Sequence, residues 1–119
     1  MAMAGTGTGT GAGAVSEVTD ADFAREVLAA GRPVLVKFTA DWCPPCRQIA
    51  PVLAEIAREE ADRLKVVRLD VDRNPLTAQR YGVLSMPTLM VFRDGEPVHS
   101  SVGARAKRRL LEDLAGALD

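Results

Sequence analysis

Apolar positions along the chain follow two spacings, one typical of buried strands and the other of amphipathic helices. Runs of neighbouring apolar and β-branched residues predict strands, whereas apolar residues three or four positions apart predict helices. The predicted strands are residues 15–18, 33–40, 64–71, 88–92 and 97–103. The predicted helices are residues 19–30, 43–63, 74–82 and a C-terminal segment that places Leu110, Leu111, Leu114 and Leu118 on one face.

The order of these elements predicts an α/β fold. Strands and helices alternate along most of the chain, which is typical of βαβ units with parallel strands. The last two strands are separated only by a short turn at Asp94-Gly95, which predicts an antiparallel hairpin. We therefore expect a mixed central sheet with helices on both faces.

Composition restricts the classes of protein that fit. The 119 residues are 47% hydrophobic and 26% charged, with a formal net charge of −1, which indicates one globular domain. The near-neutral charge gives no reason to expect nucleic acid or an anionic membrane as a partner. No apolar run approaches the ~18 residues that span a bilayer. We expect a monomer with no nucleic-acid or membrane partner.

The first fourteen residues, MAMAGTGTGTGAGA, differ in composition from the rest. They cannot bury enough surface to become ordered, so we expect a disordered Gly/Thr-rich tail at 1–14 and a domain at 15–119. The segment has neither the basic nor the apolar region of a signal peptide, which makes the cytoplasm the expected location. Gly9, Gly11 and Ala14 match a dinucleotide-binding spacing, but no predicted strand precedes them and no predicted helix follows directly. We therefore expect no bound nucleotide.

The only two cysteines, Cys43 and Cys46, lie in the stretch TADWCPPCRQIAP. Three interpretations compete for them. A structural disulfide that closes so short a loop stabilises a fold by roughly 2 kcal/mol, and the cytosol would keep it reduced. A closed zinc site needs four ligands, whereas the chain offers two cysteines and His99, so we expect no metal and a surface position for His99.

The third interpretation, a redox pair, is favoured by the position of the cysteines at the start of a predicted helix. A sulfur at a helix N-terminus lies near unpaired N–H groups and the positive end of the helix dipole, so Cys43 should have a lowered pKa and react as a thiolate. Cys46 lies on the same face of the first turn and can close a small ring with Cys43. Pro44 and Pro45 suit a first turn, whose N–H groups lack partners within the helix. A C-x-x-C pair in a βαβ context is a redox signature.

From about Val15 to the C-terminus the sequence resembles the thioredoxin family. ADWCPPC resembles the family's active-site motif, RQIAP its kinked helix, and DVDRNP the loop after its third strand. YGVLSMPTLMVFRDGE resembles the cis-proline segment and the hairpin, and VGA the glycine turn beside the active site. The resemblance implies a thioredoxin fold and a cis peptide bond between Met86 and Pro87.

The resemblance also implies roles for individual residues. Cys43 would be the attacking thiolate and Cys46 the resolving thiol, joined in the oxidised protein as a redox disulfide. An extended client segment would pair with the backbone of Met86. The residues expected to line the client-docking surface are Trp42, Pro44, Pro45, Val71, Met86, Pro87, Val102, Gly103 and Ala104. For Val71 and Val102, plain packing is an equally consistent interpretation.

The function implied by the resemblance is reduction of client-protein disulfides by dithiol–disulfide exchange. Electrons would come from NADPH through a flavin-containing thioredoxin reductase, with no cofactor bound to this chain. Two alternatives stay open at this point. One is a thiol oxidant or isomerase with a raised reduction potential, and the other is a redox-inert binding module that holds a partner in the same groove.

Two residues depart from the family pattern. Pro44 replaces the usual glycine between the cysteines, which removes a backbone donor near the thiolate. Lys37 stands where the family usually has a buried aspartate. Arg68 stands where the family usually has a cationic partner, so that position remains cationic. An ammonium of Lys37 under the site would lower the cysteine pKa values, and a neutral Lys37 could act as a base. A side chain that reaches water would leave the chemistry unchanged.

A basic cluster at the start of the last helix has no assigned role in this scheme. It consists of Arg105, Lys107, Arg108 and Arg109, placed against the preference of the helix dipole. We expect a solvated face, with a docking patch for an acidic partner as the alternative.

Overall fold

The computed structural model describes residues 13–118. Most of the predicted tail at 1–14, with the Gly9 and Gly11 of the dinucleotide-like spacing, lies outside the described residues. In chain order the elements are β1 (Ser16–Glu17), η1 (Ala24–Leu28), β2 (Val34–Thr39), α2 (Pro44–Glu59), β3 (Lys65–Asp70), α3 (Pro75–Arg80), β4 (Thr88–Arg93), β5 (Glu96–Val102) and α4 (Lys107–Leu118).

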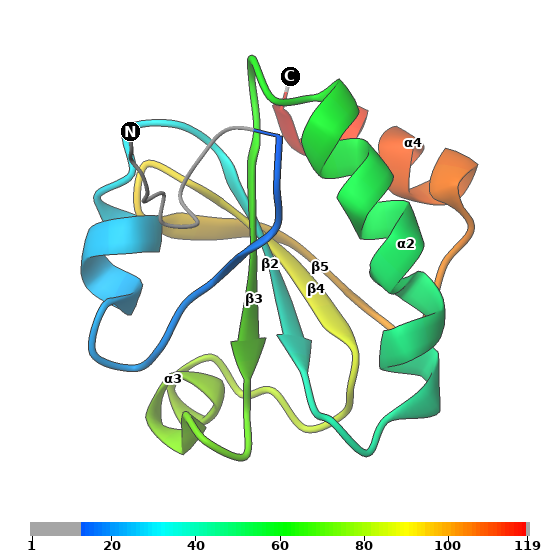
Figure 1. Cartoon of the computed structure of the whole chain (residues 1–119). Coiled ribbons are helices and arrows are strands. Elements are labelled where there is room, and N and C mark those ends of the chain that lie inside the picture. Colours follow the sequence, from blue (N-terminus) through cyan, green and yellow to red (C-terminus); the bar gives the residue numbers. More distant parts are fainter. Residues whose placement is uncertain (1–12, 119) are drawn as a thin grey trace, which may run out of the picture.

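The strands form one mixed sheet in the order β1-β3-β2-β4-β5. Strand β3 pairs in parallel with β1 and β2, whereas β4 pairs antiparallel with β2 and β5. Helices α2 and α4 cover one face of the sheet, and η1 and α3 lie on the opposite side (Figure 1). The predicted α/β fold with helices on both faces is confirmed, and each strand begins and ends within one residue of its predicted bounds.

Strand β2 places apolar and polar side chains on defined faces because successive side chains point to opposite sides of a sheet. Val36 and Phe38 pack into the core on the η1 side, whereas Leu35 packs into the core under α2 and α4. Lys37, two residues after Leu35, therefore lies on the α2 side. Arg68 of β3 stands directly opposite Lys37 in the parallel register. The two cations thus share the face that α2 covers.

The first helix differs most from the sequence prediction. The pattern predicts a helix over 19–30, but the structure forms only the short π-helix η1 at Ala24–Leu28. Its closing hydrogen bond runs from the Ala29 N–H to the carbonyl of Ala24, five residues earlier, at 2.9 Å. The prediction of a full α-helix here is wrong.

Asp20 is a residue type that can cap a helix beginning near it, but its carboxylate caps α3 instead. The carboxylate of Asp20 accepts hydrogen bonds from the N–H groups of Leu76 at 3.2 Å and Thr77 at 2.9 Å, at the start of α3. Partial burial acts to raise the pKa of Asp20, but the hydrogen bonds from Thr77 and Leu76 outweigh it and hold the pKa below 3.8. Because Asp20 serves α3, it does not cap the predicted helix, and residues 20–22 form turns. Thr19 bonds within this turn: its N–H donates to the Asp22 carboxylate at 2.6 Å, and its Oγ1 accepts from the Asp22 N–H at 3.4 Å.

Two further elements have local causes that the sequence shows. The hairpin turn between β4 and β5 has Asp94 at φ 52° and Gly95 at φ 81°. Positive φ at both central residues gives the backbone twist that a two-residue hairpin needs. Helix α2 begins at Pro44, as expected for proline in a first turn. It ends at Glu59, earlier than the predicted residue 63.

Candidate redox site

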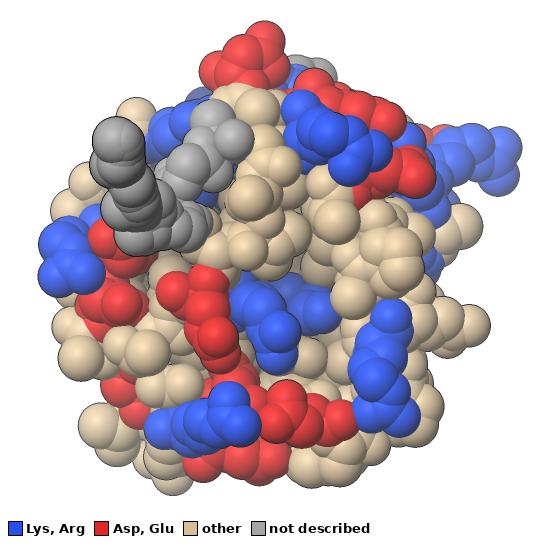
Figure 2. All heavy atoms as spheres, viewed as in Figure 1, with Lys and Arg blue, Asp and Glu red and all other residues tan. Residues whose placement is uncertain are grey.

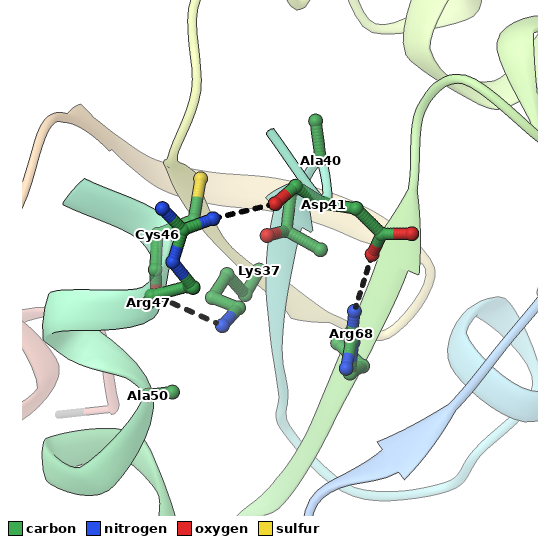
Figure 3. Close-up of a pocket in the computed structure, with 8 residues that line it drawn as sticks. Lys37, Ala40, Asp41, Cys46, Arg47, Ala50 and Arg68 are labelled. Carbon is green, nitrogen blue, oxygen red and sulfur yellow. Dashed lines mark hydrogen bonds and ion pairs between the residues drawn. The ribbon is translucent and has the colours of Figure 1, made fainter. Parts of the chain in front are cut away.

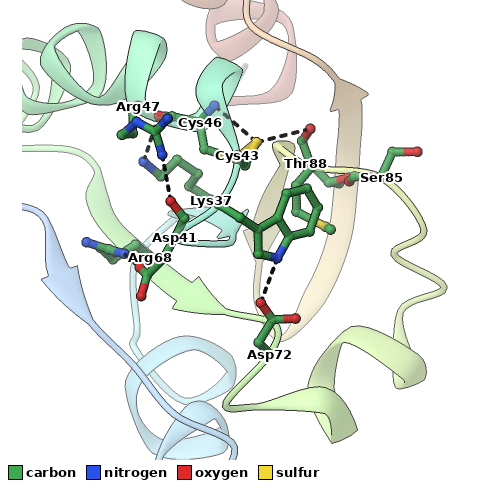
Figure 4. The surroundings of a disulfide bond; sticks show 11 residues. Lys37, Asp41, Cys43, Cys46, Arg47, Arg68, Asp72, Ser85 and Thr88 are labelled. Carbon is green, nitrogen blue, oxygen red and sulfur yellow. Dashed lines mark hydrogen bonds and ion pairs between the residues drawn. A yellow bond between two sulfur atoms is a disulfide. The ribbon is translucent and has the colours of Figure 1, made fainter.

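The two cysteines lie at the N-terminus of α2, just after the chain leaves β2 (Figure 4). Cys43 is the N-cap residue, with extended backbone angles, and Pro44 and Pro45 follow as the first helical residues. Cys43 and Cys46 are joined by a disulfide with their Cα atoms 5.3 Å apart. The helix start and the disulfide agree with the sequence prediction.

Two backbone groups surround the Cys43 sulfur. The Cys46 N–H donates a hydrogen bond to Cys43 Sγ at 3.2 Å. The Met86 carbonyl oxygen lies 3.6 Å from the same sulfur. Both cysteines are buried, at 2% and 1% exposure, so burial does not distinguish their roles. The N–H group at the helix N-terminus favours a thiolate on Cys43 once the disulfide is reduced.

The segment facing the cysteines contains the predicted cis peptide bond, between Met86 and Pro87. Met86 packs against both cysteines. The Pro87 carbonyl accepts a hydrogen bond from the Gly103 N–H at 2.8 Å. Val102 pairs with Thr88 across β4 and β5. The cis-proline segment and the VGA turn, which are distant in the sequence, therefore lie side by side.

The predicted docking residues differ in exposure. Trp42 is 62% exposed, and its indole Nε1–H donates a hydrogen bond to Asp72 at 2.8 Å. Val102 is 61% exposed at the end of β5. Val71 is half-buried and packs against both the core and the cysteines. The exposed members of the predicted surface also include Pro44, Pro45 and Ala104.

Sequence reasoning missed two residues near this surface. Asp72 orients the exposed Trp42 ring through the hydrogen bond to its N–H. Leu84 is 92% exposed and lies two residues before Met86. An isolated leucine or aspartate in a loop gives no periodic signal, so neither position could be found from spacing.

Lys37 lies beneath the active site instead of reaching bulk water. It is only 5% exposed, and its Nζ donates to the Cys46 carbonyl at 3.4 Å (Figure 3). Burial lowers the pKa of Lys37, and the charge of Arg68 lowers it further. Of the three sequence alternatives, the one in which the side chain extends into solvent is wrong.

A pocket of about 170 Å³ opens between β2, β3 and the start of α2. Its lining includes Lys37, Arg47, Arg68, Asp41 and Cys46 (Figure 3). Arg68 lies 4.0 Å from the Asp41 carboxylate, and the Arg47 guanidinium donates to the Asp41 carbonyl at 2.6 Å. Figure 2 shows Lys and Arg atoms gathered in a hollow over the sheet beside α2. Three of the eight residues that line the pocket are therefore cations, against one carboxylate.

The basic cluster at the start of α4 (Lys107–Leu118) is partly paired within the chain. Arg105 lies 2.9 Å from Asp113, and Lys107 lies 2.6 Å from Glu55 and 2.9 Å from Glu59. The hydrogen bond from Lys107 lowers the pKa of Glu55, and the bonds to Glu55 and Glu59 raise the pKa of Lys107. These pairs favour the solvated-face interpretation over an acidic docking partner.

Within residues 13–118, no three His, Cys, Asp or Glu side chains lie together as a metal site. His99 is half-buried, not fully on the surface, and its Nε2 lies 3.8 Å from Asp113. None of the helices in this described part of the chain is long and apolar enough to cross a membrane.

Comparison with known proteins adds independent evidence. The family model for thioredoxin matches residues 14–116. A thioredoxin of Mycobacterium tuberculosis (strain ATCC 25618 / H37Rv) is 54% identical over 102 residues, covering 86% of this chain and 88% of that protein. Thioredoxin 1 of Synechococcus elongatus is 52% identical over 97 residues, covering 82% and 91%. A bifunctional thioredoxin reductase/thioredoxin of Mycobacterium leprae is 52% identical over 99 residues, covering 83% of this chain and 22% of that protein.

A disulfide-forming C-x-x-C pair at a helix N-terminus, on a mixed α/β sheet, defines the class of thiol–disulfide oxidoreductases. The chain belongs to the thioredoxin family, whose members are protein-disulfide reductases. The two alternatives left open by the sequence, an oxidant or isomerase and a redox-inert module, are not favoured by these relatives.

Proposed function

We propose that this chain is a monomeric, cytoplasmic reductant of client proteins that works through Cys43 and Cys46. The observation that carries the proposal is the environment of the Cys43 sulfur. It accepts a hydrogen bond from the Cys46 N–H at the start of α2 and lies beside the Met86 carbonyl. Cys43 is therefore the sulfur that is best placed to exist as a thiolate and to attack.

The exchange proceeds in two steps. The Cys43 thiolate attacks one sulfur of a client disulfide, forming a mixed disulfide and releasing the other client sulfur as a thiolate that takes up a proton. Cys46 then loses its proton and attacks Cys43 Sγ, which re-forms the Cys43–Cys46 disulfide and releases the second client sulfur. Two electrons pass from the cysteine pair to the client, whose disulfide becomes two thiols.

The client binds as an extended segment along the irregular stretch before β4. Ser85 and Leu84 are exposed there, so the backbone next to Met86 can be reached from solvent. Main-chain hydrogen bonds at Met86 would align the client, and the exposed Trp42 and Val102 would contact its side chains. Pro44, Pro45, Gly103 and Ala104 complete this docking surface, and the buried Pro87 and half-buried Val71 support it from below by packing.

Lys37 acts as an ammonium beneath Cys46. Burial and Arg68 lower its pKa, but its Nζ retains a carbonyl acceptor and lines an open pocket, and both favour the charged form. A cation at this position favours the thiolate of Cys46, so the resolving step does not need the carboxylate base that the family usually carries.

The electron donor is an NADPH-dependent, flavin-containing thioredoxin reductase. The chain has no nucleotide-binding motif of its own within a strand–helix context. The Mycobacterium leprae relative is named as a bifunctional thioredoxin reductase/thioredoxin, which supports a reductase as the partner of this chain.

Trapping tests the assigned roles. A Cys46→Ser variant should accumulate mixed disulfides with clients, visible as bands that disappear on reduction with dithiothreitol. A Cys43→Ser variant should form none and should not reduce insulin in the presence of NADPH and thioredoxin reductase. Trapping by the Cys43→Ser protein alone would reverse the assignment of the two cysteines.

The direction of electron flow is tested by the reduction potential of the Cys43–Cys46 pair. Trp42 fluorescence can report the equilibrium against a defined glutathione buffer. We expect a value closer to the ~−270 mV of thioredoxin than to the ~−180 mV of protein disulfide isomerase. A value at or above ~−180 mV would contradict the role of reductant.

A further inference from the structure

Two cations, the buried Lys37 and the half-buried Arg68, lie side by side beneath the active site. Lys37 and Arg68 are directly opposite in the register of β2 and β3. Like charges directly opposite on neighbouring strands are destabilising. Within residues 13–118 no carboxylate forms an ion pair with Lys37, whose Nζ bonds to the Cys46 carbonyl. The charge of this pair is therefore poorly compensated by the chain itself.

Arg68 also has unused hydrogen-bonding capacity. Its Nε is buried and, among the residues that the structure describes, has no hydrogen-bond partner. Its terminal nitrogen lies 4.0 Å from Asp41, too far for a hydrogen bond. A buried donor without a partner costs about 1–3 kcal/mol. The rest of the Arg68 side chain is accessible, at 37% side-chain exposure, and lines the pocket, where it can meet a ligand with acceptor atoms.

The pocket that both cations line has room for such a ligand. Its volume of about 170 Å³ compares with roughly 30 Å³ for one water molecule in the liquid. Arg47 adds a third cation to the lining (Figure 3). A tetrahedral oxyanion can accept from Lys37 and Arg68 at once, since a guanidinium offers a fork of donors that matches phosphate.

We propose that the pocket between β2, β3 and the start of α2 is a binding site for a small oxyanion such as inorganic phosphate, held by Lys37 and Arg68. The Asp41 carboxylate opposes the anion, but it is shared with Arg73 at 3.1 Å and faces solvent, at 65% side-chain exposure. The three lining cations outnumber it. The site lies beside Cys46, so its occupancy changes the charge next to the resolving sulfur.

The test is a titration of the oxidised, isotope-labelled protein with inorganic phosphate, followed by NMR at constant ionic strength maintained with sodium chloride. We expect saturable shifts of the backbone amides of residues 37, 46 and 68, described by a single site. In Lys37→Met, which retains an apolar stem of similar volume, the affinity should fall at least tenfold. Shifts that grow linearly in the wild-type protein, or that are unchanged in Lys37→Met, would overturn the site.

Two further variants keep the test informative. Arg68→Gln should also weaken binding at least tenfold, and it provides the answer if Lys37→Met is poorly folded. Arg108→Gln removes an exposed cation elsewhere and should leave the affinity unchanged. An equal loss in Arg108→Gln would mean that phosphate responds only to net charge, which would also overturn the proposal.

Acetate distinguishes a free oxyanion from a carboxylate side chain of a client. We expect phosphate to bind at least tenfold more tightly than acetate in the same titration. Equal or tighter binding of acetate would assign the pocket to carboxylates and refute the oxyanion. The measurement uses oxidised protein without turnover, so its outcome is separate from that of the proposed reductant function.

Discussion

Replacing Lys37 by methionine should make the folded protein more stable at pH 7. Methionine retains an unbranched side chain of similar length, so repacking costs less than about 1.5 kcal/mol. The hydrogen bond to the Cys46 carbonyl is lost, but at 3.4 Å it is long, and a typical hydrogen bond contributes only about 0.5–1.5 kcal/mol. Against these losses, exchanging buried charged groups for hydrophobic residues of similar volume often stabilises by about 1–4 kcal/mol. We expect a net gain of about 1–2 kcal/mol in the free energy of unfolding.

The pH dependence of this gain identifies its cause. Burial and Arg68 lower the pKa of Lys37 in the folded state from its ordinary 10.5. Between the folded pKa and 10.5 the unfolded chain binds more protons, so the stability of the wild-type protein rises with pH in that window. The gain in unfolding free energy of the Lys37→Met protein should therefore be full below the folded pKa of Lys37. It should shrink as pH rises from that pKa towards 10.5.

Urea unfolding of the oxidised proteins in phosphate-free buffer, from pH 7 to pH 10.5, measures both effects. Arg108→Met, an exposed cation exchanged for the same side chain, should stay within about 0.5 kcal/mol of the wild-type protein. A Lys37→Met protein that is less stable than wild type by more than about 1 kcal/mol would refute the reasoning. So would an advantage that does not change with pH.

Four other changes give further tests. Asp20→Ala removes the cap of α3 and should lower the free energy of unfolding, measured with urea, by about 1–2 kcal/mol. Because the pKa of Asp20 is held below 3.8 in the folded protein, this loss should be full above pH 3.8 and should vanish as pH falls through the folded pKa. The exposed control Asp62→Ala should show little change. Trp42→Ala should raise KM for a protein client with little change in kcat, and an unchanged KM would remove Trp42 from the docking surface. Gly103→Ala should destabilise by about 1 kcal/mol in thermal unfolding, because φ is +96° although nothing lies within 4 Å. Gly116→Ala inside α4, also in open space, should instead stabilise by about 0.5–1 kcal/mol.

Much of the fold could be predicted because its causes are local. The strand patterns, the Asp94-Gly95 turn and the proline at the start of α2 each act within a few residues, and all appear as expected. The short form of the first helix could not be predicted, since Asp20 near its start is engaged at α3 instead. Asp20 bonds to residues more than fifty positions away, and no local pattern contains that information.

In the candidate site, too, features with local causes could be predicted and features that depend on distant contacts could not. The Cys43–Cys46 pair at a helix start follows from spacing and helix electrostatics, and the structure has that arrangement. The location of Lys37 was left open by the sequence because a lysine side chain can reach water from a buried backbone position. Its burial is decided by α2, which covers that face of β2 and β3, and by the Cys46 carbonyl that accepts its hydrogen bond.

The family's usual buried aspartate would form a compensated pair of charges with the cation at position 68. With Lys37 in place of that aspartate, the site instead has two cations side by side. That charge must either remain as a cost to stability or be offset by an anion from solution. The two outcomes are linked quantitatively, because a ligand that binds only the native state stabilises it by RT ln(1 + [L]/Kd). Phosphate at ten times its wild-type Kd would stabilise the wild-type protein by about 1.4 kcal/mol and Lys37→Met, with a Kd at least tenfold larger, by at most about 0.4 kcal/mol. The stability advantage of Lys37→Met should therefore fall by about 1 kcal/mol in phosphate, since both measurements report the same uncompensated charge.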